Sequence, residues 1–155
     1  MKIEFWYIGK TNEKYLDQGI QIFEKRLKHY CKYLSVCIKD VKPGKTSKET
    51  MLREAELILS KITNSDFLIL LDERGASYSS EKFSEQLNKM QMQGSRRIIF
   101  LVAGAFGADQ KLKERANKLL SLSKMTFSHQ MIRLFFVEQL YRAFTILKNE
   151  KYHNP

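Results

Sequence analysis

The chain has 155 residues, 43% of them hydrophobic, so it is long enough to bury a core without disulfides or a metal ion. It carries 27 Lys and Arg against 17 Asp and Glu, and this net charge of +10 points to an anionic partner, with nucleic acid the leading candidate. No apolar run approaches the ~20 residues of a membrane helix, and the N-terminus lacks a signal-peptide pattern. We therefore expect a cytoplasmic protein, made of one domain over residues 1–155, with no membrane partner.

Alternating and amphipathic patterns place two strands and two helices in the first 62 residues. The aromatic-rich, alternating segment 2–9 predicts a strand, after which Thr11 or Asn12 caps a helix with a basic outer face. Alternate apolar residues over 34–38 predict a second strand, and Ser47 is placed to cap the second helix.

The loop 42–47 between that strand and helix is rich in turn residues and carries Lys42 and Lys45. It either contacts phosphate groups or is simply solvated. Cys31 and Cys37 match no metal-binding or redox spacing, so we expect buried free thiols.

Two continuous apolar runs, 67–71 and 98–102, are typical of strands buried on both faces of a parallel sheet. A helix capped by Ser79 or Ser80 separates them. Asp109 is placed to begin a further helix, which we expect to extend to Leu119.

The segment 119–144 changes character along its length. It starts as a short strand or extended loop in which small side chains leave main-chain groups available to a ligand. From Gln130 it becomes a helix that is apolar around almost its whole circumference, more than one face of a sheet would cover. We therefore expect part of this helix to pack on a second copy of the chain. Its Glu138–Arg142 pair is either an exposed ion pair or part of a site.

Alternation of strands and helices predicts an α/β fold with a mainly parallel sheet of about five strands and helices on both faces. Loops 71–75, 103–107 and 121–127 follow its strands, and open sheets bind ligands at that edge. Dinucleotide, Walker and Gly-x-Ser-x-Gly motifs are absent from the sequence. Asp72 and Glu73 would suit a nucleotide hydrolase, but the sequence singles out no partner acid or base.

A set of short motifs runs through the whole chain: Leu71-Asp72 with Gly75, the Gly104/Gly107 loop, segment 122–129, then Arg133, Glu138, Gln139, Tyr141-Arg142-Ala143 and a terminal Tyr152-His153. In this combination the chain resembles the RlmH family of SPOUT methyltransferases. Members of that family methylate N3 of a pseudouridine in large-subunit (23S) ribosomal RNA. The resemblance implies a C-terminal trefoil knot, an S-adenosyl-L-methionine donor, no metal, and a homodimer acting on ribosomal RNA or the assembled ribosome.

Carried over position by position, the resemblance also implies a site. Its donor-binding residues are Leu71, Ala103, Gly104, Leu122, Ser123, Lys124, Met125, Thr126 and Phe127. The candidate catalytic residues are His129, Arg142 and His153. The target imide nitrogen must lose a proton, for which a histidine is a suitable base.

Two positions depart from the family pattern, because Ala103 stands where glycine is common and Ser128 where proline is common. The tail 149–155 is either a frayed end or an arm that reaches the donor loop of a second copy. The alternative function, a basic ribosome- or RNA-binding protein without catalytic activity, explains the charge but not the donor-loop motifs.

Overall fold

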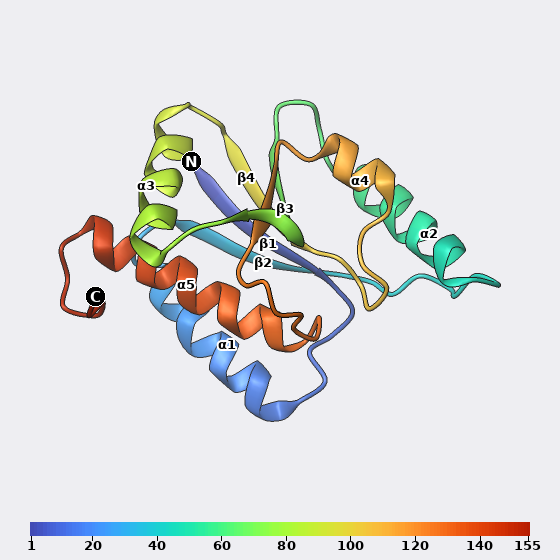
Figure 1. Ribbon diagram of the computed structural model, residues 1–155, viewed down its shortest axis with the longest axis horizontal. Coiled ribbons are helices and arrows are strands. Elements are labelled where there is room, and N and C mark those ends of the chain that lie inside the picture. Colours follow the sequence, from blue (N-terminus) through green and yellow to red (C-terminus); the bar gives the residue numbers. More distant parts are fainter.

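The computed structural model describes all 155 residues, and its centre is a parallel five-stranded sheet (Figure 1). Its strands are β1 (Lys2–Ile8), β2 (Lys32–Ile38), β3 (Phe67–Ser77), β4 (Arg97–Val102) and β5 (Lys118–Ser121). They are ordered β2-β1-β4-β3-β5, and every neighbouring pair is parallel. The helices are α1 (Lys14–Leu27), α2 (Ser47–Leu59), α3 (Ser80–Met92), α4 (Gln110–Arg115) and α5 (Met131–Leu147). The predicted α/β architecture is confirmed.

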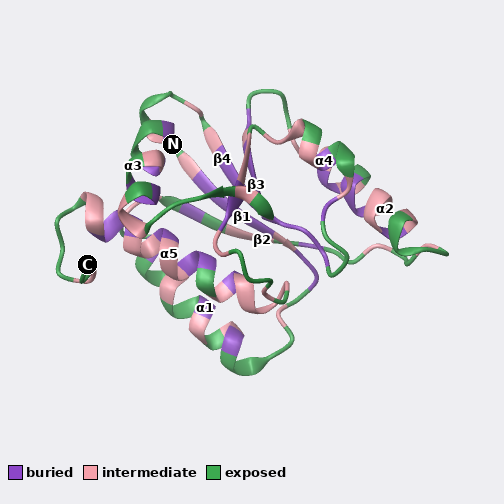
Figure 2. Cartoon of the chain, viewed as in Figure 1, coloured by how far each residue is buried: buried purple, intermediate pink, exposed green.

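Helices cover both faces of the sheet and create two cores (Figures 1 and 2). On one face α1, α3 and α5 pack together, and Phe5, Phe100 and Phe136 lie at the centre of that core. On the other face α2 and α4 cover a smaller core that includes Ile58 and Leu101. A strand held between two helix layers needs apolar side chains on both sides, which is why β4 is apolar throughout residues 98–102.

Two helix starts differ from the sequence prediction by one or two residues. Glu13, not Thr11 or Asn12, precedes the first residue of α1, while the Thr11 hydroxyl accepts a hydrogen bond from Arg133. At α2 the capping residue is Thr46, whose Oγ1 accepts the main-chain N–H of Glu49 at 3.1 Å.

The predicted helix from Asp109 is correct at its start but ends at Arg115, well before Leu119. Asn117 is the cause, since its main-chain N–H and side-chain Oδ1 bond the carbonyl and N–H of Leu68, both at 2.8 Å. These bonds draw the chain into β5, alongside β3. Strand β3 in turn runs on to Ser77 after a register shift between Leu71 and Ala76.

The expectation that both thiols are buried is wrong, because Cys31 is only half-buried and Cys37 is exposed. Strand β2, which carries Cys37, lies at the edge of the sheet and has a neighbour on one side only. None of the helices is both long enough and apolar enough to cross a membrane.

Arg133, in the first turn of α5, is the largest fully buried side chain in the molecule. Its guanidinium donates to the carbonyls of Ile8, Gly9 and His129 at 2.7, 3.0 and 3.0 Å, and to the Thr11 hydroxyl at 3.1 Å. No carboxylate forms an ion pair with it, and it lies 4.4 Å from the centre of the Tyr7 ring. One side chain therefore joins the end of β1 to the start of α5.

Replacing Arg133 by Met would keep the apolar stem and leave several buried carbonyls without a donor. We expect the free energy of unfolding to fall by about 3 kcal/mol. Urea denaturation at one fixed protein concentration measures this loss. Arg133→Lys, which keeps the charge but presents fewer donors in a different geometry, should lose less stability than Arg133→Met. An unchanged midpoint for Arg133→Met would contradict this role.

Candidate functional site

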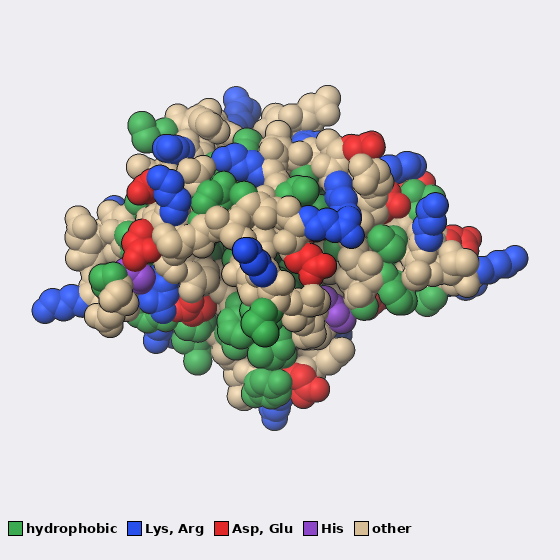
Figure 3. Space-filling view, viewed as in Figure 1, with side chains coloured by type: hydrophobic (Ala, Val, Ile, Leu, Met, Phe, Trp, Pro, Cys, Tyr) green, Lys and Arg blue, Asp and Glu red, His purple; other side chains and the backbone are tan.

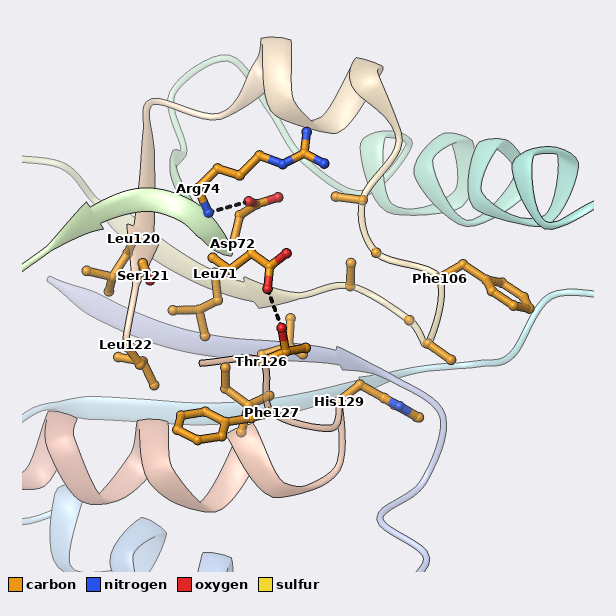
Figure 4. Close-up of a pocket in the computed structure, with 18 of the residues that line it drawn as sticks. Leu71, Asp72, Arg74, Phe106, Leu120, Ser121, Leu122, Thr126, Phe127 and His129 are labelled. Carbon is orange, nitrogen blue, oxygen red and sulfur yellow. Dashed lines mark hydrogen bonds between the residues drawn. The ribbon is translucent and has the colours of Figure 1, made fainter. Parts of the chain in front are cut away.

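A cavity of about 370 Å³ opens at the carboxyl ends of β3 and β4, beside the segment that follows β5 (Figure 4). Its volume lies within the ~300–1,000 Å³ that is usual for small-molecule sites. Segments 71–74, 103–108 and 120–129 supply most of its wall. The sequence analysis expected these segments to converge, but its loop 71–75 is wrong, because these residues continue strand β3 at its register shift.

The structure brings most of the predicted site residues to this cavity and leaves three outside its wall. Those that line it are Leu71, Ala103, Gly104, Leu122, Ser123, Met125, Thr126, Phe127 and His129. Lys124 is exposed on the same loop but is not part of the wall. Arg142 and His153 lie towards the other end of α5, away from the cavity.

Several wall residues were not predicted, among them Met51, Phe106 and Ile132. The sequence did carry a signal for Phe106, which is an aromatic residue between two glycines of a predicted ligand loop. In the structure its side chain is 58% exposed. Met51 carried none, because α2 approaches the cavity only through the packing of the fold.

The loop after β5 is held in shape by its own serine side chains. Ser121 Oγ donates to the carbonyl of Ser123 at 2.8 Å, and Ser123 Oγ accepts the N–H of Met125 at 2.9 Å. These short bonds set a tight turn and leave neighbouring main-chain groups free to bond a ligand.

The carboxylates considered for a hydrolase already have partners within the structure. Asp72 accepts the main-chain N–H of Arg74 at 2.9 Å and lies 3.8 Å from the Lys113 ammonium. Glu73 accepts a 2.7 Å hydrogen bond from the Thr126 hydroxyl and so links the end of β3 to the loop after β5 (Figure 4). Neither carboxylate is paired with a histidine or a second acid for proton transfer, so the geometry does not support hydrolysis.

Gly104 lies close against a carboxylate beneath the loop after β4. A Cβ atom at this position would lie 2.6 Å from Oε1 of Glu54, which is buried at 9% exposure on α2. Burial raises the pKa of Glu54, and the charge of Asp40 raises it further, while the N–H of Gly104 opposes both effects. The neighbouring methyl group of Ala103 is accommodated in a buried position.

His129 lines the cavity immediately before α5 and is half-buried (Figure 4). Burial lowers its pKa, the positive charge of Arg133 lowers it further, and Asp40 acts in the opposite direction. The neutral imidazole, the form that can accept a proton, is therefore favoured at neutral pH.

Arg142 and His153 belong to a network that holds the C-terminal tail against α5 and α3. Arg142 bonds Glu138 Oε1 at 2.6 Å and His153 Nδ1 at 3.2 Å, and His153 Nε2 lies 2.8 Å from Glu81 Oε1. The Tyr152 hydroxyl donates to the same Glu138 oxygen at 2.9 Å. The tail is thus a bound segment and not a frayed end.

Comparison with known proteins identifies what the chain is similar to. Residues 1–153 match the family model described as "Predicted SPOUT methyltransferase". The protein named Ribosomal RNA large subunit methyltransferase H from Christiangramia forsetii is 51% identical, over 99% of each chain. The protein of that name from Cytophaga hutchinsonii is 45% identical, over 99% of this chain and all of the relative. A solved structure, a probable methylase family protein from Haemophilus influenzae, matches with a TM-score of 0.54 at 12% identity, over 99% of this chain and 70% of its own.

The contact between Gly104 and Glu54 yields a test of the cavity. In Gly104→Ala the new methyl group must displace the Glu54 carboxylate or the loop, and we expect binding of the methyl donor to weaken about tenfold, ~1.4 kcal/mol. Calorimetric titration measures the affinity. The double variant Gly104→Ala/Glu54→Ala has room for the methyl group and should bind more tightly than Gly104→Ala alone. Undiminished binding by Gly104→Ala would show that this loop does not shape the donor site.

Proposed function

Because this chain belongs to the family of SPOUT methyltransferases, we propose that it transfers a methyl group from S-adenosyl-L-methionine to N3 of a pseudouridine in large-subunit (23S) ribosomal RNA. The observation that carries the proposal is the meeting of the three motif-bearing loops around one cavity of about 370 Å³. Two further facts support it: relatives named for ribosomal RNA methylation match nearly end to end, and the net charge of +10 suits an RNA substrate. We treat residues 1–155 as one methyltransferase domain.

The cavity wall suits the donor. Leu71, Leu122 and Phe127 offer an apolar slot for a flat adenine ring, and the main chain of the loops after β4 and β5 offers donors and acceptors for its edge. The donor supplies a methyl group that its sulfonium already activates, so the protein mainly binds and orients. Ser123, Met125 and Thr126 line the same space, together with Gly104.

His129 is our candidate for the base. The pseudouridine N3 loses its proton to the imidazole and forms a bond to the methyl carbon. The carbon–sulfur bond breaks in the same exchange, and its electron pair converts the sulfonium to a neutral thioether. Placement on the cavity wall and a lowered pKa support this role.

We also propose a homodimer and the trefoil knot that the family resemblance implies. Apolar side chains remain exposed on the outer side of α1 and α5, with Tyr15 at 63%, Ile22 at 52% and Phe135 at 41%. Covering them on a second copy would bring the C-terminal network of one chain towards the cavity of the other. Arg142 and His153, which lie away from the cavity of their own chain, would then act on the RNA held by the partner.

The proposed function is tested by methyl transfer to ribosomes from a strain that lacks this gene. We expect the protein to add one methyl group per large subunit, mapped by mass spectrometry of the digested RNA. His129→Ala should lower the rate about 10²-fold or more at neutral pH. For the native protein the rate should fall as the pH drops through the lowered pKa of His129, because the protonated imidazole accepts no proton.

Two results would reject parts of this proposal. Donor binding without transfer to ribosomes or to protein-free ribosomal RNA would mean a different acceptor. Absence of both donor binding and transfer would leave the non-catalytic RNA-binding protein as the better account.

The dimer is tested on an exposed residue, because Phe136 and Leu140 of α5 are fully buried in the chain's own core. We expect Ile22→Glu to yield a folded monomer by light scattering that still binds donor but has lost most methyl transfer. Met92→Glu places the same charge on a side chain that is 79% exposed on α3, and it should remain dimeric and active. A monomeric native protein, or an Ile22→Glu dimer with full activity, would refute this interface.

A further inference from the structure

The segment from the end of β2 into the first turn of α2 carries a row of lysines that form no ion pair in the structure. Lys39, Lys42, Lys45 and Lys48 recur at every third position, and all four are exposed. None of them forms an ion pair. Residues 39–48, which we call the lysine loop, therefore present four ammonium groups that form no ion pair within the chain.

The lysine loop has a fixed shape, unlike a flexible basic tail. Arg53 of α2 donates to the carbonyls of Lys42 and Pro43 at 2.9 and 3.3 Å. The N–H of Lys45 bonds Glu49 Oε2 at 2.6 Å, and the N–H of Gly44 bonds the Thr50 hydroxyl at 2.9 Å. The first turns of α2 thus bind the loop through its main chain and leave the lysine side chains free.

Gly44 makes this tight arrangement possible. A Cβ atom there would lie 2.6 and 2.7 Å from Cγ and Cβ of Glu49, which are rigid positions close to the α2 backbone. Any side chain at this position would force the loop away from the helix.

The lysine loop lies at the same edge of the sheet as the cavity. It follows the carboxyl end of β2 and leads into α2, whose Met51 lines the cavity and whose Glu54 supports Gly104. Figure 1 shows this connection extending beyond the rest of the molecule, and Figure 3 shows basic side chains at its tip.

We propose that the lysine loop is a preformed arm that binds the phosphate backbone of the ribosomal RNA while the target base enters the cavity. This inference rests on the proposed function and specifies how its substrate is held. Ammonium groups release counterions when they contact phosphates, which favours binding without reading the base sequence. A main chain that is already ordered loses little conformational entropy on binding, so less of the binding free energy is lost in ordering the loop.

The charge is tested with Lys42→Gln/Lys45→Gln/Lys48→Gln. Binding to protein-free large-subunit RNA and to ribosomes is measured over a salt series, with donor binding as the check of folding. We expect the slope of log K against log salt to become shallower by about 0.7 to 0.9 per lysine, and affinity to fall roughly tenfold or more at moderate salt. Donor affinity should be unchanged.

A matched control removes the same charge from the opposite edge of the sheet. Lys32, Lys61 and Lys89, which lie at or before the amino ends of β2, β3 and β4, are exposed and form no ion pairs. Their replacement by Gln should change the salt slope far less. Equal effects of the two triple variants would mean that only net charge matters, which would overturn the proposal of a dedicated arm.

Shape is tested separately with Gly44→Val, which keeps every charge. We expect weaker RNA binding with a nearly unchanged salt slope, and normal donor binding. Native RNA affinity in Gly44→Val would refute preorganisation, and lost donor binding would assign the loop to the donor site.

A triple lysine variant that binds ribosomes poorly but protein-free RNA normally would indicate a ribosomal protein as partner and overturn the phosphate contact. If the native protein transfers methyl groups and the lysine variants match it in binding and rate, the arm fails while the proposed function stands.

Discussion

The buried guanidinium of Arg133 is the constraint on which the geometry of the site depends. It bonds the last residues of β1 on one side and the His129 carbonyl on the other, so the end of a central strand and the start of α5 share one set of hydrogen bonds. The loop that lines the cavity ends at this junction. A cation without a carboxylate partner is costly to bury, and four oxygen acceptors and the Tyr7 ring offset that cost. The same charge lowers the pKa of the adjacent His129, so one residue influences both the position and the protonation of the candidate base.

A second buried charge, Glu54, has the opposite sign and supports the opposite wall. It lies beneath Gly104 without an ion-pair partner, and burial together with Asp40 raises its pKa. Loops at the ends of parallel strands have few contacts of their own, so such side chains from neighbouring helices are needed to define their shape. Two buried side chains, Arg133 and Glu54, therefore support the main chain on either side of the cavity.

The sequence predicted the architecture well because burial on both faces of a parallel sheet leaves a strong pattern. The runs in β3 and β4 and the late helix could be read directly, and the cavity loops after β4 and β5 follow from where those strands end, whereas the register shift that places 71–74 at the cavity inside β3 could not be read. Predictions that depend on a single side chain were weaker. Thr11 looked like a helix cap, yet its hydroxyl bonds Arg133, more than a hundred residues away in the chain. Asn117 ended α4 through bonds to Leu68, a contact that no local propensity encodes. Arg133 itself was only a polar interruption in an apolar helix, because its acceptors are main-chain carbonyls and carbonyls leave no trace in a sequence.

Helix α5 has a different role at each end. At its start His129 and Ile132 line the cavity, whereas the Glu138–Arg142 pair further along the helix holds Tyr152 and His153. Arg133 and Arg142 lie nine residues apart on this 17-residue helix, a rise of about 14 Å at 1.5 Å per residue, and neither Arg142 nor His153 lines the cavity of its own chain. The tail is fixed against α3 and α5 by the Tyr152 ring and by the side-chain contacts of Tyr152 and His153. It therefore stays away from the cavity of its own chain. If the terminal Tyr-His pair contributes to methyl transfer, it must do so across an interface, and the exposed apolar side chains of α1 and α5 are where that interface would form.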